Sequence, residues 1–477
     1  MNADPARRFP AAVPVVLAAT FVQLLDLTMV SVAVPSIRSD LGAGAGTAQL
    51  LIAGYTLAYA CVLITAARLG DRYGHRRLFL VGVGLFALAA GVCAAATGPA
   101  MLVAGRVLQG VASGLMAPQV LSIIQISVPA TRRARAMGYF GAAMGLASLI
   151  GPVLGGLVIA ADLGGLGWRP IFLADMGIAA AILAAAALLP TGRSTGRQKV
   201  NGGSAALAMT GLGALMLPLA IGRDSGWPVW TFVLMGVGVA VLGVFALTQS
   251  RQADPLLHPD VLKNRTARTG ILLVLVFNAG VPSFSYLLFI HLQTGSGYSP
   301  LEAGLAASPF AAAAIAGSRL AAGLTGRLGA YLLPVAAAAI ALSMAALAFP
   351  VRFDMPLWTQ LPWFATAGAA FGVFTASVFA LVLAQIRPEA VGSASGLLPT
   401  AQQLGGSIGI TIAGLVYLSF PGGPHTAFSA ALFYEAGVFL LAATIALRLG
   451  HDHGRTPEMA RPISRRPWQS SALARRR

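Results

Sequence analysis

Residues 67–77 read ARLGDRYGHRR and separate two apolar runs, at 48–66 and 78–97. Each run is long enough to cross about 30 Å of hydrocarbon as a helix. Gly70 and Gly74 allow a tight turn between the two runs. Asp71 is expected near the start of the second helix, where the helix dipole favours a carboxylate. The stretch therefore predicts two membrane helices joined by a short charged loop.

The composition of the chain excludes most soluble classes of protein. Of 477 residues, 57% are hydrophobic and 10% are charged, and the mean hydropathy is +0.78. A soluble globule needs about 25% charged residues to cover its surface. The two cysteines, Cys61 and Cys93, lie alone in apolar runs, so they form neither a CxxC site nor a disulfide framework. We expect a polytopic, all-α membrane protein.

Apolar runs recur along the chain and predict fourteen membrane spans. The spans are expected near 13–35, 48–66, 78–97, 101–126, 137–160, 170–190, 204–222, 228–249, 269–291, 303–323, 329–349, 357–385, 396–419 and 427–447. They divide the chain into a six-helix bundle at 1–190, a linker with two additional spans and a cytoplasmic loop at 191–268, a second six-helix bundle at 269–447 and a basic cytoplasmic tail at 448–477.

The basic residues indicate the orientation of these spans. Of the 32 Lys and Arg residues, 27 fall on the side that holds both termini, four fall on the other side and Arg106 lies within a span. Positive charge collects on the cytoplasmic side of membrane proteins. The net charge of +17 is therefore explained by topology, without a nucleic-acid partner, and both termini are predicted to be cytoplasmic.

A weak internal repeat relates the last six spans to the first six. Residues 138–157 and 396–415 align without gaps at an offset of 258, with seven of the 20 positions identical. Two six-helix halves with extra helices between them are typical of a duplicated transporter.

The charged loop is a candidate conformational latch. Asp71 and the flanking arginines can pair with each other or with a neighbouring helix end in one conformation only. The alternative is an ordinary positive-inside loop, which explains the arginines but not the aspartate and glycines. The predicted latch residues are Gly70, Asp71, Arg72, Gly74, Arg76 and Arg77.

The fifth span places small residues and a proline on one helix face. Gly141, Gly145, Ser148, Pro152 and Gly155 follow one another at steps of four, three, four and three residues. Such a face permits close packing between membrane helices, which is the simplest interpretation of the pattern.

Four charged residues lie well inside predicted spans and are candidates for proton coupling: Asp26, Arg106, Asp175 and Glu435. A charge within the bilayer is costly unless it is paired or hydrated. At about 1.5 Å per residue, the depths of Asp26 and Arg106 differ by roughly 6 Å, which a long arginine can bridge. For Asp175 and Glu435 the alternative is a structural hydrogen bond or a place near the membrane interface.

Polar and aromatic side chains of several spans are candidates for substrate binding. They are Gln23, Tyr55, Tyr59, Gln109, Asn278 and Tyr286. A mostly apolar, aromatic cavity suits an amphipathic ligand better than a sugar, which needs many placed donors and acceptors.

Several motifs resemble one known family. The loop at 67–77 is similar to the signature loop of the major facilitator superfamily, with Ala67 in place of its first glycine. LLDLTMVSVAVPSI at 24–37 resembles the first-helix motif of the fourteen-helix drug:proton antiporter branch. GRVLQGVASG from Gly105 resembles the arginine motif of the fourth helix, and GPVLGG from Gly151 resembles the antiporter motif of the fifth.

The resemblance implies the major facilitator fold and a role for the fifth helix. In antiporters this helix bends at its proline and helps to seal the cavity against proton leak, which here would involve Gly141, Gly145, Gly151, Pro152, Gly155 and Gly156. The chain departs from the family pattern at the sixth span, where Asp175 and Gly177 stand in place of Asn and Pro. A titratable group has been added there.

The sequence thus predicts proton-coupled efflux of hydrophobic or cationic drugs or natural products by alternating access, in the cell inner membrane. The alternatives are a proton-coupled carrier of a polar nutrient or metabolite and, from another class, a membrane enzyme or sensor. No GxxxxGK[ST], GxSxG, HExxH or CxxC motif occurs, which disfavours a membrane enzyme or sensor. We expect no enzyme activity, cofactor or metal, and a monomer whose partners are an amphipathic small molecule, protons and membrane lipid.

Overall fold

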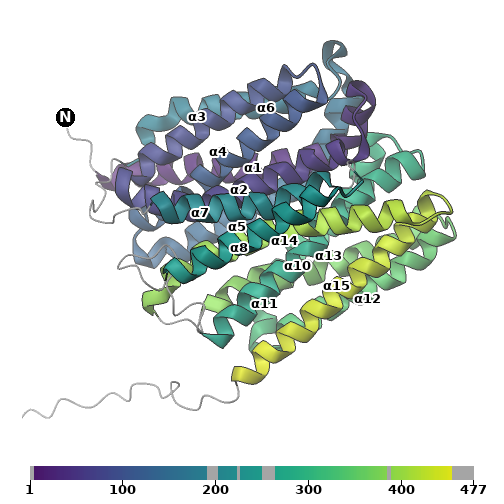
Figure 1. Cartoon of the computed structure of the whole chain (residues 1–477). Coiled ribbons are helices and arrows are strands. Elements are labelled where there is room, and N and C mark those ends of the chain that lie inside the picture. The colour runs from purple at the N-terminus through teal and green to yellow at the C-terminus, as the bar shows by residue number, and fades with distance from the viewer. Residues whose placement is uncertain (1–4, 191–201, 223–225, 250–263, 384–387, 454–477) are drawn as a thin grey trace, which may run out of the picture.

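The computed structural model describes the chain except for residues 1–4, 191–201, 223–225, 250–263, 384–387 and 454–477. Parts of the predicted linker at 191–268 and of the tail at 448–477 therefore lie outside the described residues. The described part is helical throughout (Figure 1).

The first six helices come from residues before 190. They are α1 (Pro5–Leu41), α2 (Ala45–Tyr73), α3 (His75–Ala94), α4 (Pro99–Ser127), α5 (Ala130–Ala161) and α6 (Arg169–Ala184). The last six are α10 (Arg265–Ile290), α11 (Pro300–Leu328), α12 (Leu332–Arg352), α13 (Leu361–Leu383), α14 (Pro388–Ser419) and α15 (Pro424–His453). Between them come α7 (Gly202–Ile221) and α8 (Val229–Gln249).

Twelve of these helices are long and apolar enough to cross a membrane, counted over the described residues. They include every long helix named above except α7 and α14. An α-helix satisfies its own backbone hydrogen bonds, which is why helices are suited to span hydrocarbon. The protein is therefore a multi-pass, all-helical membrane protein.

The two six-helix sets have the same internal pairing. α1 packs on α5, α2 on α4, and α3 on α6, and in the second set α10 packs on α14, α11 on α13, and α12 on α15. The sets meet where α2 contacts α14 and where α5 contacts α11. In Figure 1 the purple-to-blue set lies above the green-to-yellow set, with α7 and α8 across the front. The shared pairing agrees with the internal repeat in the sequence.

One predicted boundary is wrong, at the loop between the second and third spans. α2 continues to Tyr73 and α3 begins at His75, so only Gly74 separates them. Gly74 has φ +94°, a conformation that favours glycine. Asp71 therefore lies in the last turn of α2 and not at the start of α3. Apolar periodicity ends where the helix leaves the hydrocarbon, although the helix itself continues.

Candidate functional site

Asp26 and Arg106 form a buried ion pair between α1 and α4. The Arg106 Nη1 donates to both carboxylate oxygens of Asp26, at 2.6 and 2.8 Å, and both side chains are 0% exposed. Removing two charges from water costs several kcal/mol per ion, which close pairing offsets. The pair therefore holds α1 and α4 in one arrangement at this depth.

Neighbouring groups fix the orientation of the Arg106 guanidinium. Its Nη1 also donates to Gln109 Oε1 at 2.8 Å, and its Nε donates to the Leu51 carbonyl of α2 at 2.9 Å. The guanidinium carbon lies 4.6 Å from the centre of the Tyr55 ring. Hydrogen bonds on two sides and a cation–π contact make Arg106 the link between α1, α2 and α4.

Asp175 of α6 joins this pair. Its side chain is 1% exposed, and its carboxyl lies next to that of Asp26. Neither Asp175 oxygen has a conventional donor among the described residues. We call Asp26, Arg106 and Asp175 the charged triad. The sequence named Asp175 as a candidate for proton coupling, with a structural hydrogen bond or a place near the membrane interface as the alternative, and the structure places it beside Asp26 and Arg106.

Four of the six predicted binding residues lie in the first helix set, close to the charged triad. Tyr55 donates to Ser113 Oγ at 2.8 Å and stacks on Tyr59, with ring centres 6.3 Å apart. Gln23 of α1 lies next to Tyr59. Gln109 completes this group through its bond to Arg106. Polar groups from α1, α2 and α4 are thus gathered into one connected network.

The other two predicted binding residues, Asn278 and Tyr286, lie on α10 in the second helix set. Asn278 Nδ2 donates to the Val274 carbonyl of its own helix at 2.8 Å, and Tyr286 is 4% exposed. In the described part of the chain, Asn278 thus bonds within its own helix and not to the network around Arg106.

Glu435 of α15 forms a separate buried site. Its Oε1 accepts a hydrogen bond from Ser283 of α10 at 2.5 Å, while its Oε2 has no donor among the described residues. The side chain is 1% exposed. Glu435 therefore belongs to the contact between α10 and α15, which is the counterpart of the contact between α1 and α6.

Two members of the network around Arg106 were missed by sequence reasoning. Cys93 of α3 donates through its Sγ to Gln109 Oε1 at 3.5 Å, and Ser113 accepts from Tyr55. A cysteine or a serine inside an apolar run is common in membrane helices, so no pattern in the sequence distinguishes these two.

The predicted latch residues make three kinds of contact. Asp71 Oδ1 lies 3.4 Å from His75 Nε2, and His75 Nδ1 lies 2.7 Å from Gln119 Oε1 of α4. Arg76 Nη2 donates to the Ala186 carbonyl, just after α6, at 3.0 Å. A Cβ at Gly70 would overlap the end of the Gln119 side chain and the His75 ring, so both would have to move. Arg72 and Arg77 are exposed. Among the pairs seen in the described part of the chain, Asp71 thus lies against His75.

The fifth helix packs against both helix sets through its glycines. A Cβ on Gly151 or Gly155 would overlap Thr28 or Met29 of α1, and a Cβ on Gly156 would overlap the backbone at Pro300 and Leu301 of α11. Gly145 faces Ile315 of α11, and the Pro152 carbonyl lies against Gly304. The surroundings of Gly141 lie outside the described residues. The helix is therefore a close-packed wedge between α1 and α11.

Polar contacts join the two helix sets near the end of the bundle where the chain turns at residues 42–44. Gln293 Nε2, just after α10, donates to the Val32 carbonyl of α1 at 2.8 Å. Gln49 Nε2 of α2 donates to the Ile410 carbonyl of α14 at 2.9 Å. With the contact of Gly156 on α11, these bonds hold the two sets together at this end, which we call the α1–α2 end.

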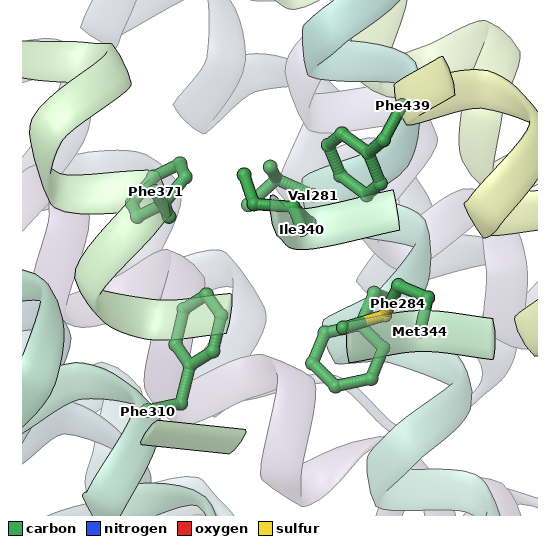
Figure 2. Close-up of a pocket in the computed structure, with 7 residues that line it drawn as sticks. All are labelled: Val281, Phe284, Phe310, Ile340, Met344, Phe371 and Phe439. Atoms are coloured by element: carbon green, nitrogen blue, oxygen red, sulfur yellow. The ribbon is translucent and has the colours of Figure 1, made fainter. Parts of the chain in front are cut away.

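Figure 2 shows a small apolar pocket inside the second helix set. Its lining is Val281, Phe284, Phe310, Ile340, Met344, Phe371 and Phe439. None of the six predicted binding residues lines it. The aromatic rings surround a space that suits apolar groups, and all five helices that form it, α10, α11, α12, α13 and α15, belong to the second set.

Comparisons with known proteins agree with this architecture. The chain matches the Major Facilitator Superfamily over residues 16–410. It is 37% identical over 431 residues to a probable actinorhodin transporter of Streptomyces coelicolor, covering 88% of this chain and 74% of that protein. It is 32% identical over 454 residues to a puromycin resistance protein of Streptomyces alboniger, covering 91% and 89%.

Solved structures share the fold. A crystal structure of a peptide transporter POT in complex with sulfate superposes with a TM-score of 0.70 at 16% identity, covering 94% of this chain and 99% of that one. The family predicted from the motifs is confirmed, and it is a family of transporters and not of enzymes. The chain belongs to the major facilitator superfamily.

Proposed function

We propose that the protein exports antibiotics or related amphipathic natural products in exchange for protons. Two relatives that match 88% and 91% of the chain are named a probable actinorhodin transporter and a puromycin resistance protein. The observation that carries proton coupling is the fully buried Asp26–Arg106 pair between α1 and α4. A carboxyl at this depth is a functional site by default in a membrane protein.

In the proposed arrangement the chain crosses the inner membrane fourteen times, with α7 and α14 included and both termini in the cytoplasm. The excess of basic residues on the side of the termini supports this orientation. The α1–α2 end then faces outward, and the bonds of Gln293 and Gln49 close the outer side of the interface between the halves.

The other predicted groups receive roles consistent with their contacts. Tyr55, Tyr59, Gln23 and Gln109, together with Asn278 and Tyr286 of α10, are proposed to contact substrate when the two sets separate. The loop around Asp71, Gly74 and Arg76 is proposed to act as a latch, because Arg76 connects the start of α3 to the Ala186 carbonyl, just after α6. The wedge of α5 is proposed to limit proton leak between the halves.

Everted membrane vesicles test the proposal. Respiration acidifies their lumen, and an exporter that exchanges drug for protons dissipates the gradient when drug is added outside. We expect puromycin or actinorhodin to collapse the gradient in vesicles with the wild-type protein. Asp26→Asn should abolish the response at normal protein abundance.

Asp40→Asn is the matched control, because Asp40 is a half-exposed residue of the same helix that pairs with Arg169 at 2.9 Å. This variant should respond like the wild type. Proton flux of wild-type size in Asp26→Asn would refute the assignment of Asp26. A response to sugars or amino acids alone would favour the polar-nutrient carrier instead.

A further inference from the structure

The charged triad contains more acid than base. Asp26, Arg106 and Asp175 come from α1, α4 and α6, and each side chain is 0 or 1% exposed. The other titratable groups that face the triad are Cys93 of α3 and Tyr55 of α2, and both carry no charge when protonated. Among the described residues Arg106 is thus the cation of this site, set against two carboxyls.

Three polar atoms of the triad have no hydrogen-bond partner among the described residues. Arg106 gives Nη1 and Nε to acceptors, but its Nη2 has no acceptor among the described residues. Both oxygens of Asp175 lack a conventional donor. The carboxyl of Asp175 on α6 lies next to that of Asp26 on the neighbouring helix α1. Two carboxyls hydrogen bond to each other only when one of them carries a proton.

An ionised carboxylate without a donor or a cation is very costly in a buried apolar site. Two adjacent carboxyls likewise do not both ionise when a single cation faces them. One proton on the acid pair removes both problems, because it provides the missing donor and leaves one negative charge opposite Arg106. The triad then has no net charge.

We propose that Asp26 and Asp175 share one proton and together form the coupling site, with Arg106 as the counter-charge of the pair. This inference rests on the proposed antiport and extends it, because it names a second acid and sets one exchangeable proton at this site.

The shared proton has a consequence for the substrate. Release of the proton leaves two carboxylates competing for one guanidinium, and the site gains a net negative charge. An amphipathic cation neutralises that charge as the proton did, so the two exclude each other. A cationic compound should therefore drive exchange better than a neutral compound of similar shape.

Infrared spectroscopy of the unliganded, full-length protein in detergent tests the inference. A protonated carboxyl gives a carbonyl stretching band that an ionised one lacks, and ordinary Asp side chains are ionised at neutral pH. The measurement uses a Glu435→Gln background, which removes the other buried acid that lacks a cation. We expect a band at neutral pH that shifts when the aspartate carboxyls are labelled with ¹³C.

Either Asp175→Asn or Asp26→Asn in that background should abolish the band, because each leaves one acid paired with Arg106. A band that survives in either variant, or the absence of an aspartate band before these substitutions, would overturn the inference. The isotope shift, measured in the Glu435→Gln protein itself, tests for a protonated aspartate even if a further variant does not fold. Because no transport is measured, a negative result here is distinct from a failure of the vesicle assay, which would count against the proposed function.

Discussion

Removal of the Arg106 charge should destabilise the protein by a large and specific amount. Arg106→Met leaves the Asp26 carboxylate buried without the two hydrogen bonds at 2.6 and 2.8 Å. Breaking a buried ion pair by removing one partner costs about 3–5 kcal/mol. We expect the lower end of that range, because a buried acid can bind a proton instead of remaining charged.

A double-mutant cycle separates the pair from other effects of the substitution. Asp26→Asn alone should cost less than Arg106→Met, because Asp175 remains as a counter-charge for Arg106. The double variant should be more stable than the sum of the two single changes predicts, with a coupling free energy of about 2–3 kcal/mol.

The free energy of unfolding is measured by titration with dodecyl sulfate in mixed micelles, followed by tryptophan fluorescence. Arg77→Met is the control, since Arg77 is exposed at the start of α3. It should change stability by less than about 0.5 kcal/mol. Additive costs in the cycle, with a coupling near zero, would show that the ion pair does not stabilise the folded protein.

Three further predictions concern packing, the latch and topology. Gly156→Ala should lower stability and transport because its Cβ would overlap the α11 backbone, whereas Gly177→Ala has nothing within 4 Å and should be neutral in the same micelle titration. Asp71→Asn should slow turnover in vesicles while leaving ligand affinity nearly unchanged, and normal turnover with weakened binding would contradict the latch. Cysteines placed at Arg197 and Arg455 should react with impermeant probes only in everted vesicles, so labelling from outside intact cells would reverse the proposed topology.

The sequence was informative where a residue is chemically unusual for the segment that contains it. A charge inside an apolar run is rare, so Asp26 and Arg106 stood out, and the estimate of their depths allowed the contact that the structure contains. The two glycines of the charged loop were also recognisable, because each has a specific steric reason: Gly74 has a positive φ, and Gly70 lies against Gln119.

The remainder of the site depends on packing between helices far apart in the chain. Asp175 was visible as a buried charge, but no periodic pattern shows which side of α6 faces α1. Cys93 and Ser113 are small residues in apolar runs and carried no signal at all. The contact of Asp71 with His75 was missed because apolar periodicity ends before α2 does, which placed the aspartate on the wrong helix.

Helix α1 connects the charged triad to the contacts between the two helix sets at the α1–α2 end. Asp26 binds Arg106, Thr28 and Met29 lie against the glycines of α5 one turn or less further on, and the Val32 carbonyl accepts from Gln293 of the second set. A helix transmits rotation along its axis because its backbone hydrogen bonds fix each turn to the next. In the proposed antiport, a change in the charge of Asp26 alters the bond that holds α1 to α4, and we expect it to shift the Val32 carbonyl that joins the two sets at the α1–α2 end. The proposal thus couples protonation to opening through one rigid helix, as exchange requires.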